Sequence, residues 1–285
     1  MFADVLFTVL VYILIPLLLA GSYLRIIYIF RSKHKYYKRE CFQIIIQLGV
    51  VQCLTVPAVV IFGIENLLGQ DPSNITATGV IGMWSASKTD CVLALVLALD
   101  RVNVVIGLPR YESIAKSLKF FGWTFGIAHF ILLHTPLCVV KIPKNVFGGY
   151  FDYNKPFSYE LEVAGMLVVF TTTTFKLLSY IHIFHYLFFQ RHQMQTVRLH
   201  VNEKVILIQG VVKFVADMFA LFLFHYYRKF MAENALSEFT KVSLLCFDKL
   251  LLPQMLHLWL IRSLRRDFFF CCFSEKKKPM TVTLL

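Results

Sequence analysis

Charged residues are scarce in this chain. Of its 285 residues, 16% are Asp, Glu, Lys or Arg, whereas 58% are hydrophobic and 15% are aromatic. Soluble domains carry about 25% charged residues, so this composition excludes an ordinary soluble domain and indicates an integral membrane protein. Negatively charged residues are scarcer than positively charged ones, with 17 Asp and Glu against 29 Lys and Arg. The net charge of +12 is unevenly spread, which disfavours nucleic-acid binding and instead orients the chain in a membrane.

Disulfide and metal-binding patterns of cysteine are missing from this chain. Most of the seven cysteines fall inside apolar runs, where a reduced thiol behaves as a small hydrophobic side chain. Their spacing gives neither a disulfide framework nor a metal-binding motif. The sequence also lacks a Ser-His-Asp grouping, a phosphate-binding glycine loop and a zinc signature. We therefore expect no enzymatic activity, no metal and no cofactor.

Long apolar runs recur along the chain and predict its fold. A helix needs about 20 apolar residues to cross the hydrocarbon core of a bilayer. The first run is longer than the core of a signal peptide and lacks a cleavage site, so it predicts a retained helix. The predicted fold class is an all-α membrane protein, a seven-transmembrane helix bundle with spans at residues 5–30, 41–64, 83–105, 120–140, 161–189, 205–226 and 242–261.

Basic residues predict the orientation of these spans. Five of the residues 31–40 are Lys or Arg, and the positive-inside rule places such a segment in the cytoplasm. The N-terminus is therefore predicted outside and the C-terminus cytoplasmic, with seventeen Lys and Arg in the inner segments. The first outer loop has no cation and contains Asn74 in an Asn-Ile-Thr sequon. Asn74 is a candidate N-glycosylation site, although such triplets also occur by chance.

The third apolar run ends in Asp100 and Arg101, two charges that hydrocarbon rejects unless they are paired or lie at the interface with water. In a seven-span chain with an outer N-terminus, this pair falls on the inner side. There it resembles the Asp-Arg-Tyr signature of rhodopsin-like G-protein-coupled receptors, with Val102 in place of the tyrosine. In its compact length and its abundance of Phe and Tyr, the chain resembles the nematode serpentine chemoreceptors more than other receptor groups. Among these receptors, the Srg-type superfamily is the preferred assignment.

Other motifs of this receptor class are incomplete. Pro253 matches the proline of an Asn-Pro-x-x-Tyr motif, but the Asn and the Tyr are absent. The sixth run has no Cys-Trp-x-Pro, and no cysteine stands where the usual outer disulfide begins. The resemblance implies a receptor domain over residues 1–262 and a cytoplasmic segment over 263–285, which starts with a short amphipathic eighth helix.

The resemblance also implies a role for Arg101. In such receptors this arginine is held by its acidic neighbour, here Asp100, and by an acid at the inner end of the sixth span, where Glu203 stands. Release of this ionic lock frees the arginine for a heterotrimeric G protein. The alternative is that Asp100 and Arg101 only anchor the span at the interface.

Charges inside the predicted spans form the second group of candidates. Such charges are costly in a bilayer, so they face the bundle interior or water and often mark functional sites. We expect them to line a ligand pocket or to form structural pairs such as Lys213 with Asp217, one helical turn apart, or Asp248 with Lys176 or Lys249. The pocket candidates are Asp90, Asp248, Asp217, Lys213 and Lys176.

The tail carries the last candidates. Cys271 and Cys272 follow an amphipathic segment and suit palmitoylation; the alternative is two unmodified interfacial cysteines. The basic residues around them are expected to contact anionic membrane lipids. The sequence thus predicts a chemosensory receptor of the plasma membrane or of a sensory cilium that binds an odorant or metabolite and signals to a heterotrimeric G protein. A small transporter or channel that uses the buried Lys and Asp residues is the alternative.

Overall fold

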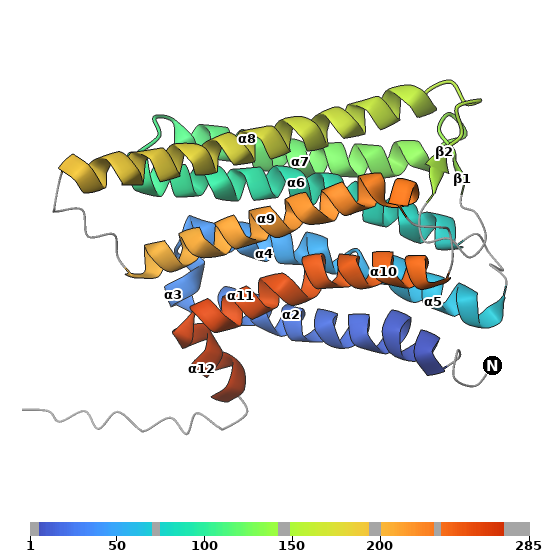
Figure 1. The fold of residues 1–285 in the computed structure, drawn as a ribbon, viewed down its shortest axis with the longest axis horizontal. Helices are drawn as coiled ribbons and strands as arrows, with labels where there is room; N and C mark the ends of the chain where they lie inside the picture. Colours follow the sequence, from blue (N-terminus) through green and yellow to red (C-terminus); the bar gives the residue numbers. More distant parts are fainter. Residues whose placement is uncertain (1–5, 70–74, 142–148, 194–200, 231–234, 271–285) are drawn as a thin grey trace, which may run out of the picture.

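The computed structural model describes residues 6–69, 75–141, 149–193, 201–230 and 235–270, and they form an elongated bundle of helices (Figure 1). The short β1 and β2 lie at the end of the bundle where the chain begins, and α3 and α12 lie at the opposite end. The elements are η1 (Val9–Leu14), α2 (Ile15–Ser32), α3 (His34–Tyr37), α4 (Glu40–Cys53), α5 (Val56–Leu68), α6 (Ile75–Ile106), α7 (Tyr111–Leu133), β1 (Val140–Lys141), β2 (Tyr150–Phe151), α8 (Ser158–Gln193), α9 (Val201–Phe230), α10 (Ala235–Cys246), η2 (Phe247–Leu251), α11 (Leu252–Leu260) and α12 (Arg262–Phe270).

Three prolines account for the interruptions within the long helices. Pro16, Pro57 and Pro253 each stand in the first turn of an α-helix, directly after an irregular turn. A proline has no backbone N–H and its ring clashes with the preceding turn, so the helix before it must widen or break. The chain widens into the π-helices η1 and η2 before Pro16 and Pro253, and it breaks between α4 and α5 before Pro57.

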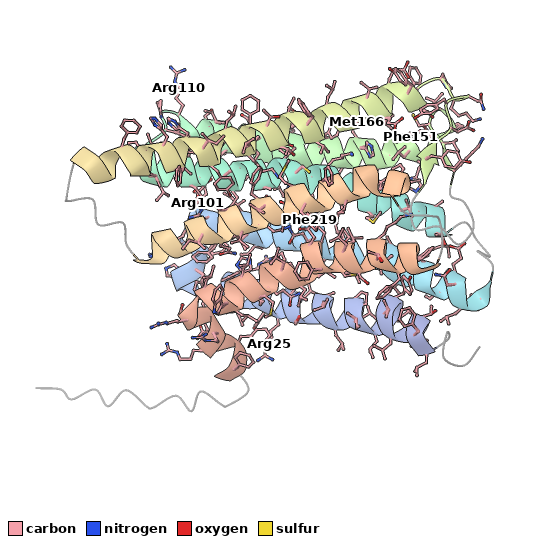
Figure 2. All side chains as sticks on the ribbon, in the orientation of Figure 1. Arg25, Arg101, Arg110, Phe151, Met166 and Phe219 are labelled. Atoms are coloured by element: carbon pink, nitrogen blue, oxygen red, sulfur yellow. The ribbon has the colours of Figure 1, made fainter. Side chains whose placement is uncertain are left out.

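The bundle buries several charged side chains among its apolar core residues and exposes many large apolar side chains. Asp90, Arg101 and Lys176 are each only 5% exposed, whereas Phe170 and Phe184 are 71% and 73% exposed. Figure 2 shows the side chain of Arg101 among the helices and that of Arg110 projecting away from them. An apolar exterior of this extent favours a lipid environment, because soluble monomers rarely expose large contiguous apolar patches.

Hydropathy supports the predicted spans in part. Within the described residues, three helical segments are long and apolar enough to cross a membrane, namely Leu6–Ser32, Glu40–Leu68 and Ser158–Tyr186. A fourth is added if Phe239–Leu260 and Arg262–Phe269, which are bent by 106° from each other, count as one. The helices α6, α7 and α9 do not meet these criteria, and each carries charged residues that lower its mean hydropathy.

Several local features differ from the sequence-based expectations; α6, for example, begins at Ile75 and not at residue 83. The fourth predicted span began at residue 120, but α7 begins at Tyr111, because its amphipathic first turns pack against α4 and α6 through Tyr111 and Ala115. The predicted all-α fold also has a two-stranded antiparallel hairpin, in which Val140 pairs with Phe151. Asp152 follows this hairpin, and the hydrogen bond from Lys141 lowers the pKa of its carboxyl group.

The short helix α12 turns back against α2. Lys33 forms an ion pair with Asp267 at 2.8 Å, and Tyr36 donates a hydrogen bond to Ser263 at 2.9 Å. Arg25 donates to the carbonyl of Phe268 and lies over its ring. These contacts fix α12 at the end of the bundle opposite the hairpin. Its role as a cytoplasmic eighth helix and the boundary at residue 262 between two domains stay predictions.

Close packing of α6 on α7 depends on Gly126. A methyl group at this position would overlap the hydroxyl of Thr89 and approach the carbonyl of Ser85 to 3.3 Å. We expect Gly126→Ala to lower the free energy of unfolding by about 1–3 kcal/mol, because overpacking forces the two helices apart. Thermal unfolding of the purified protein measures this effect. Gly82→Ala is the matched control, since its new methyl would meet only Phe130 at 3.7 Å; equal midpoints for the two variants would contradict the prediction.

Candidate functional site

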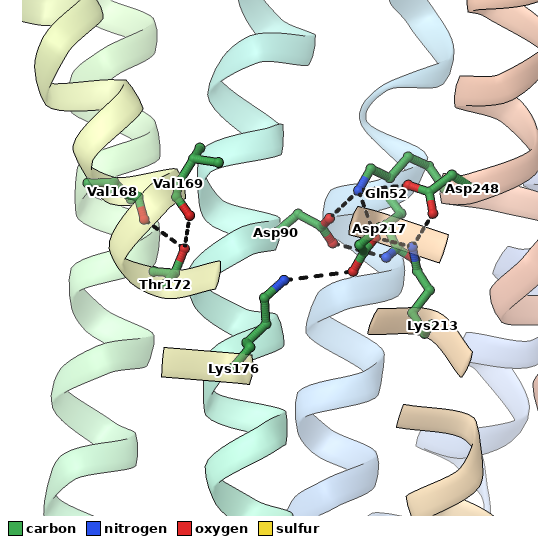
Figure 3. Close-up of polar contacts among 10 residues, drawn as sticks. Gln52, Asp90, Val168, Val169, Thr172, Lys176, Lys213, Asp217 and Asp248 are labelled. Carbon is green, nitrogen blue, oxygen red and sulfur yellow. Dashed lines mark hydrogen bonds and ion pairs between the residues drawn. The ribbon is translucent and has the colours of Figure 1, made fainter. Parts of the chain in front are cut away.

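Six charged side chains from four helical segments meet inside the bundle. Figure 3 labels five of them, Asp90, Lys176, Lys213, Asp217 and Asp248. We call this group the ion-pair cluster. Its three lysines and three aspartates balance in formal charge, and each makes a charge contact with another member. They are Asp90 of α6, Lys176 of α8, Lys213 and Asp217 of α9, and Asp248 and Lys249 of η2.

Lys249 is the centre of the ion-pair cluster. Its Nζ lies 2.8 Å from Asp90, 3.1 Å from Asp248 and 3.5 Å from Asp217. One ammonium thus contacts the carboxylates of three helical segments. Such contacts offset the large cost of removing these charges from water.

Lys213 supplies the second set of contacts. Its Nζ lies 2.5 Å from Asp217, one turn further along α9, and 2.7 Å from Asp248. Lys176 of α8 approaches Asp217 only to 3.8 Å, which is too long for a hydrogen bond. The cluster therefore joins α9 tightly to η2 and α8 loosely to α9.

The π-helix η2 explains how neighbouring residues reach the same cluster. Pro253 cannot donate a hydrogen bond to the carbonyl of Lys249, four residues earlier, so the chain widens through Phe247–Leu251. Asp248 and Lys249 both lie in this widened turn and both face the other charges. Single-turn π-helices of this kind occur frequently at functional sites.

A chain of uncharged groups extends the cluster to α2 and α4. Gln52 donates to Asp90 at 3.0 Å and accepts a hydrogen bond from the hydroxyl of Tyr23 at 2.8 Å. Sequence reasoning missed Gln52, although a polar residue within an apolar run was the signal that identified the charged candidates. It also missed His129 of α7, which is fully buried and hydrogen-bonded to Ser85 at 2.9 Å.

All five predicted pocket candidates lie in the ion-pair cluster. Four of them contact one another, and Asp90 is joined to them through Lys249. The sequence left open whether Asp248 pairs with Lys176 or with Lys249; in the structure Asp248 contacts Lys249 and Lys213. The predicted pair of Lys213 with Asp217 is present. Whether any of these residues contacts a ligand stays a prediction.

Asp100 and Arg101 are both buried near the other end of α6, away from the hairpin. Nη2 of Arg101 lies 3.4 Å from Oδ2 of Asp100, and neither atom has a hydrogen-bond partner among the described residues. The other carboxylate oxygen of Asp100 accepts a hydrogen bond from Tyr111 at 3.1 Å. Arg101 is thus a buried cation that forms an ion pair with Asp100 among the described side chains.

The remaining candidates lie where the structure gives no side-chain geometry. Glu203 belongs to α9, but its side chain is not among those described, so the predicted contact with Arg101 stays a prediction. Asn74, Cys271 and Cys272 lie outside the described residues.

A cavity of about 70 Å³ links the ion-pair cluster to Arg101. Its wall includes Asp90, Lys176 and Lys213 from the cluster. Further along, the wall includes Arg101 and Tyr180. Asp90 and Arg101 are separated by about 16 Å along α6. The cavity therefore brings polar groups at two depths of the bundle into one space.

Comparison with known proteins establishes the fold. No family model and no curated protein matches the chain. Among solved structures, the crystal structure of squid rhodopsin is similar with a TM-score of 0.66 at 12% sequence identity, over 96% of this chain and 89% of that chain. The chain has the helical fold of a rhodopsin-like integral membrane protein.

Proposed function

We propose that this protein is a rhodopsin-like receptor that binds a small molecule at its outer side and signals to a heterotrimeric G protein. The observation that supports the proposal best is the buried pair Asp100 and Arg101 in a rhodopsin-like bundle. This pair stands at the end of α6 that the distribution of basic residues predicts as cytoplasmic.

The ion-pair cluster supplies a physical link between the two sides in this proposal. It joins α6, α8, α9 and η2 through contacts that depend on the relative positions of these helices. A ligand that prefers a different packing of the outer ends would shift these contacts, and the shift would reach Arg101 through α6. Coupling of this kind is reciprocal, so a partner bound at the inner side would in turn raise the affinity for the ligand.

The ion pairs within the cluster limit the charge of a ligand that could bind there. Asp90 and Asp248 already have cationic partners, so a cationic ligand would have to displace an ammonium group from them. We infer that these aspartates set the helix packing and that the ligand contacts uncharged groups nearer the outer mouth. We retain the proposal of a chemosensory receptor of the nematode serpentine type at the plasma membrane, which rests on the compact length and the many aromatic residues.

A screen of odorants and small metabolites tests the receptor proposal. The chain is expressed in cultured cells together with G-protein α subunits, and a second messenger is recorded after each compound. We expect at least one compound to raise the signal in a saturable way only in cells that carry both the chain and an α subunit. A response of the same size without the α subunit would contradict G-protein coupling.

A transporter or channel is the second proposal, and the cavity beside the buried Lys and Asp residues favours it. Purified protein in liposomes would then move ions or solute across the bilayer. Flux above that of empty liposomes would support transport. A response in the second-messenger screen together with no flux would reject it.

A further inference from the structure

Lys88 of α6 lies outside the ion-pair cluster, where α7 and α8 approach each other. A methyl group built on Gly165 of α8 would lie 3.5 Å from Nζ of Lys88 and 3.8 Å from Nε2 of His129 in α7. The helix α6 packs closely against both α7 and α8, which make few contacts with each other. We call the place marked by Lys88, His129 and Gly165 the α7–α8 seam.

The α7–α8 seam reaches the apolar exterior of the bundle. Lys88 itself is half-buried, so part of its side chain lies at the surface. Leu132 of α7, close to His129, and Leu167 of α8, close to Gly165, are both exposed. In a membrane these side chains contact hydrocarbon, and the ammonium group of Lys88 therefore stands at the border between protein and lipid.

Lys88 has no counterion in direct contact. It forms no hydrogen bond and no ion pair within the part of the chain that the structure describes. Glu162 of α8 acts on it electrostatically, but this carboxylate accepts a hydrogen bond from Tyr153 at 2.6 Å and is not within ion-pairing distance of Lys88. Each lysine of the ion-pair cluster, in contrast, contacts a carboxylate. An unpaired cation beside hydrocarbon is costly, so the seam favours an anionic guest.

Apolar packing closes the direct route from Lys88 to the membrane surface. Side chains of a helix point toward its N-terminus, so Lys88 is directed to the hairpin end of the bundle. There Ile81 of α6, Leu133 of α7 and Leu161 of α8 are buried in one cluster with the hairpin. The ammonium group cannot extend through this cluster to water or to lipid head groups. An anion must therefore approach it sideways, through the lipid.

His129 offers a second donor at the same place. Its Nδ1 lies 2.9 Å from the hydroxyl of Ser85. When this hydroxyl donates to Nδ1, the ring proton is on Nε2, which lies beside Lys88 at Gly165. Two neighbouring donors, one of them charged, match the two oxygens of a carboxylate.

We propose that the α7–α8 seam binds the carboxylate of a long-chain fatty acid that reaches Lys88 from the membrane. A fatty acid has one chain and a small head group, whereas the phosphate of a phospholipid stays at the level of the membrane surface, beyond the apolar cluster. The carboxylate selects the guest, because lipid tails gain little by exchanging hydrocarbon for an apolar protein surface. This site is independent of the proposed receptor function, and its test needs no G protein.

Fluorescence of Trp84 tests the site, because Trp84 stands one turn before Lys88 on α6. The full chain with Trp123→Phe and Trp259→Phe is placed in bilayer nanodiscs in alkaline buffer. Stearic acid that carries a nitroxide next to its carboxyl group is then added, and its methyl ester serves as the uncharged control. We expect the acid to quench Trp84 in a saturable way and the ester to give only a small linear decrease. Equal quenching by the two would overturn the proposal.

Variants of Lys88 assign the effect to its charge. Lys88→Met should weaken the apparent affinity for the acid by about tenfold or more, and Lys88→Arg should retain binding. Lys116→Met is the matched control, since it removes a cation at an exposed position of α7. Unchanged affinity in Lys88→Met, or an equal loss in Lys116→Met, would overturn the assignment.

Two further measurements identify the guest. Phosphatidic acid with a nitroxide on its chain should quench Trp84 less than the fatty acid does; stronger quenching that depends on Lys88 would overturn the choice of a fatty acid. In the unaltered protein, a fatty acid with a photoreactive group beside its carboxylate should label peptides of α6, α7 or α8 next to Lys88. Labelling confined to other helices would overturn the proposal without any substitution.

Discussion

Replacing Lys249 with methionine is expected to lower the free energy of unfolding by about 3–5 kcal/mol, because it leaves buried carboxylates without their cation. Lys249 contacts Asp90, Asp217 and Asp248, whereas Asp90 has no other cationic partner among the described residues. Methionine retains much of the volume of lysine, so the effect reports the lost charge and not a cavity. The midpoint of thermal unfolding and the yield of folded protein measure it.

A second substitution separates this charge effect from general damage. In Lys249→Met combined with Asp90→Asn, the cluster is again neutral, and the asparagine oxygen can still accept from Gln52. We expect the double variant to recover about half or more of the lost stability, as residues in direct contact are non-additive. Simple addition of the two single effects would show that Lys249 does not stabilise the fold through Asp90.

Replacing Arg101 with glutamine is expected to abolish signalling to a G protein while the protein still reaches the cell surface. The guanidinium group is buried beside Asp100 and has an unused donor, so it is available to an inner partner when the helices separate. Glutamine keeps a polar group near Asp100 but removes the charge. Second-messenger output after a compound identified in the screen, divided by the surface amount of the protein, measures the effect.

The control for this substitution is another cation on the same side of the bundle. Lys116→Gln makes the same loss of charge at an exposed position of α7. We expect its output to remain within about twofold of the unaltered protein, since exposed substitutions change stability little. Full signalling by Arg101→Gln would remove the assigned role of Arg101, and an equal loss in both variants would point to net charge instead.

Much of the architecture was predictable from the sequence. Apolar runs are local signals, so they predicted the helices. Basic segments predicted an orientation that stays a prediction. The start of α7 was predicted too late because its first turns contain Glu112 and Lys116, which lower hydropathy without preventing a helix. The hairpin was missed because β1 and β2 are only two residues each, too short for an alternating pattern.

The sequence by itself determined that charges stand inside apolar helices and that they must be paired or face a polar space. Only the tertiary structure decided which charges pair. Lys249 and Asp90 are 159 residues apart, and the periodicity of one helix says nothing about the rotation of another around its axis. The widened turn before Pro253 and the packing of four helical segments set that rotation, and with it the cluster and the cavity that leads to Arg101.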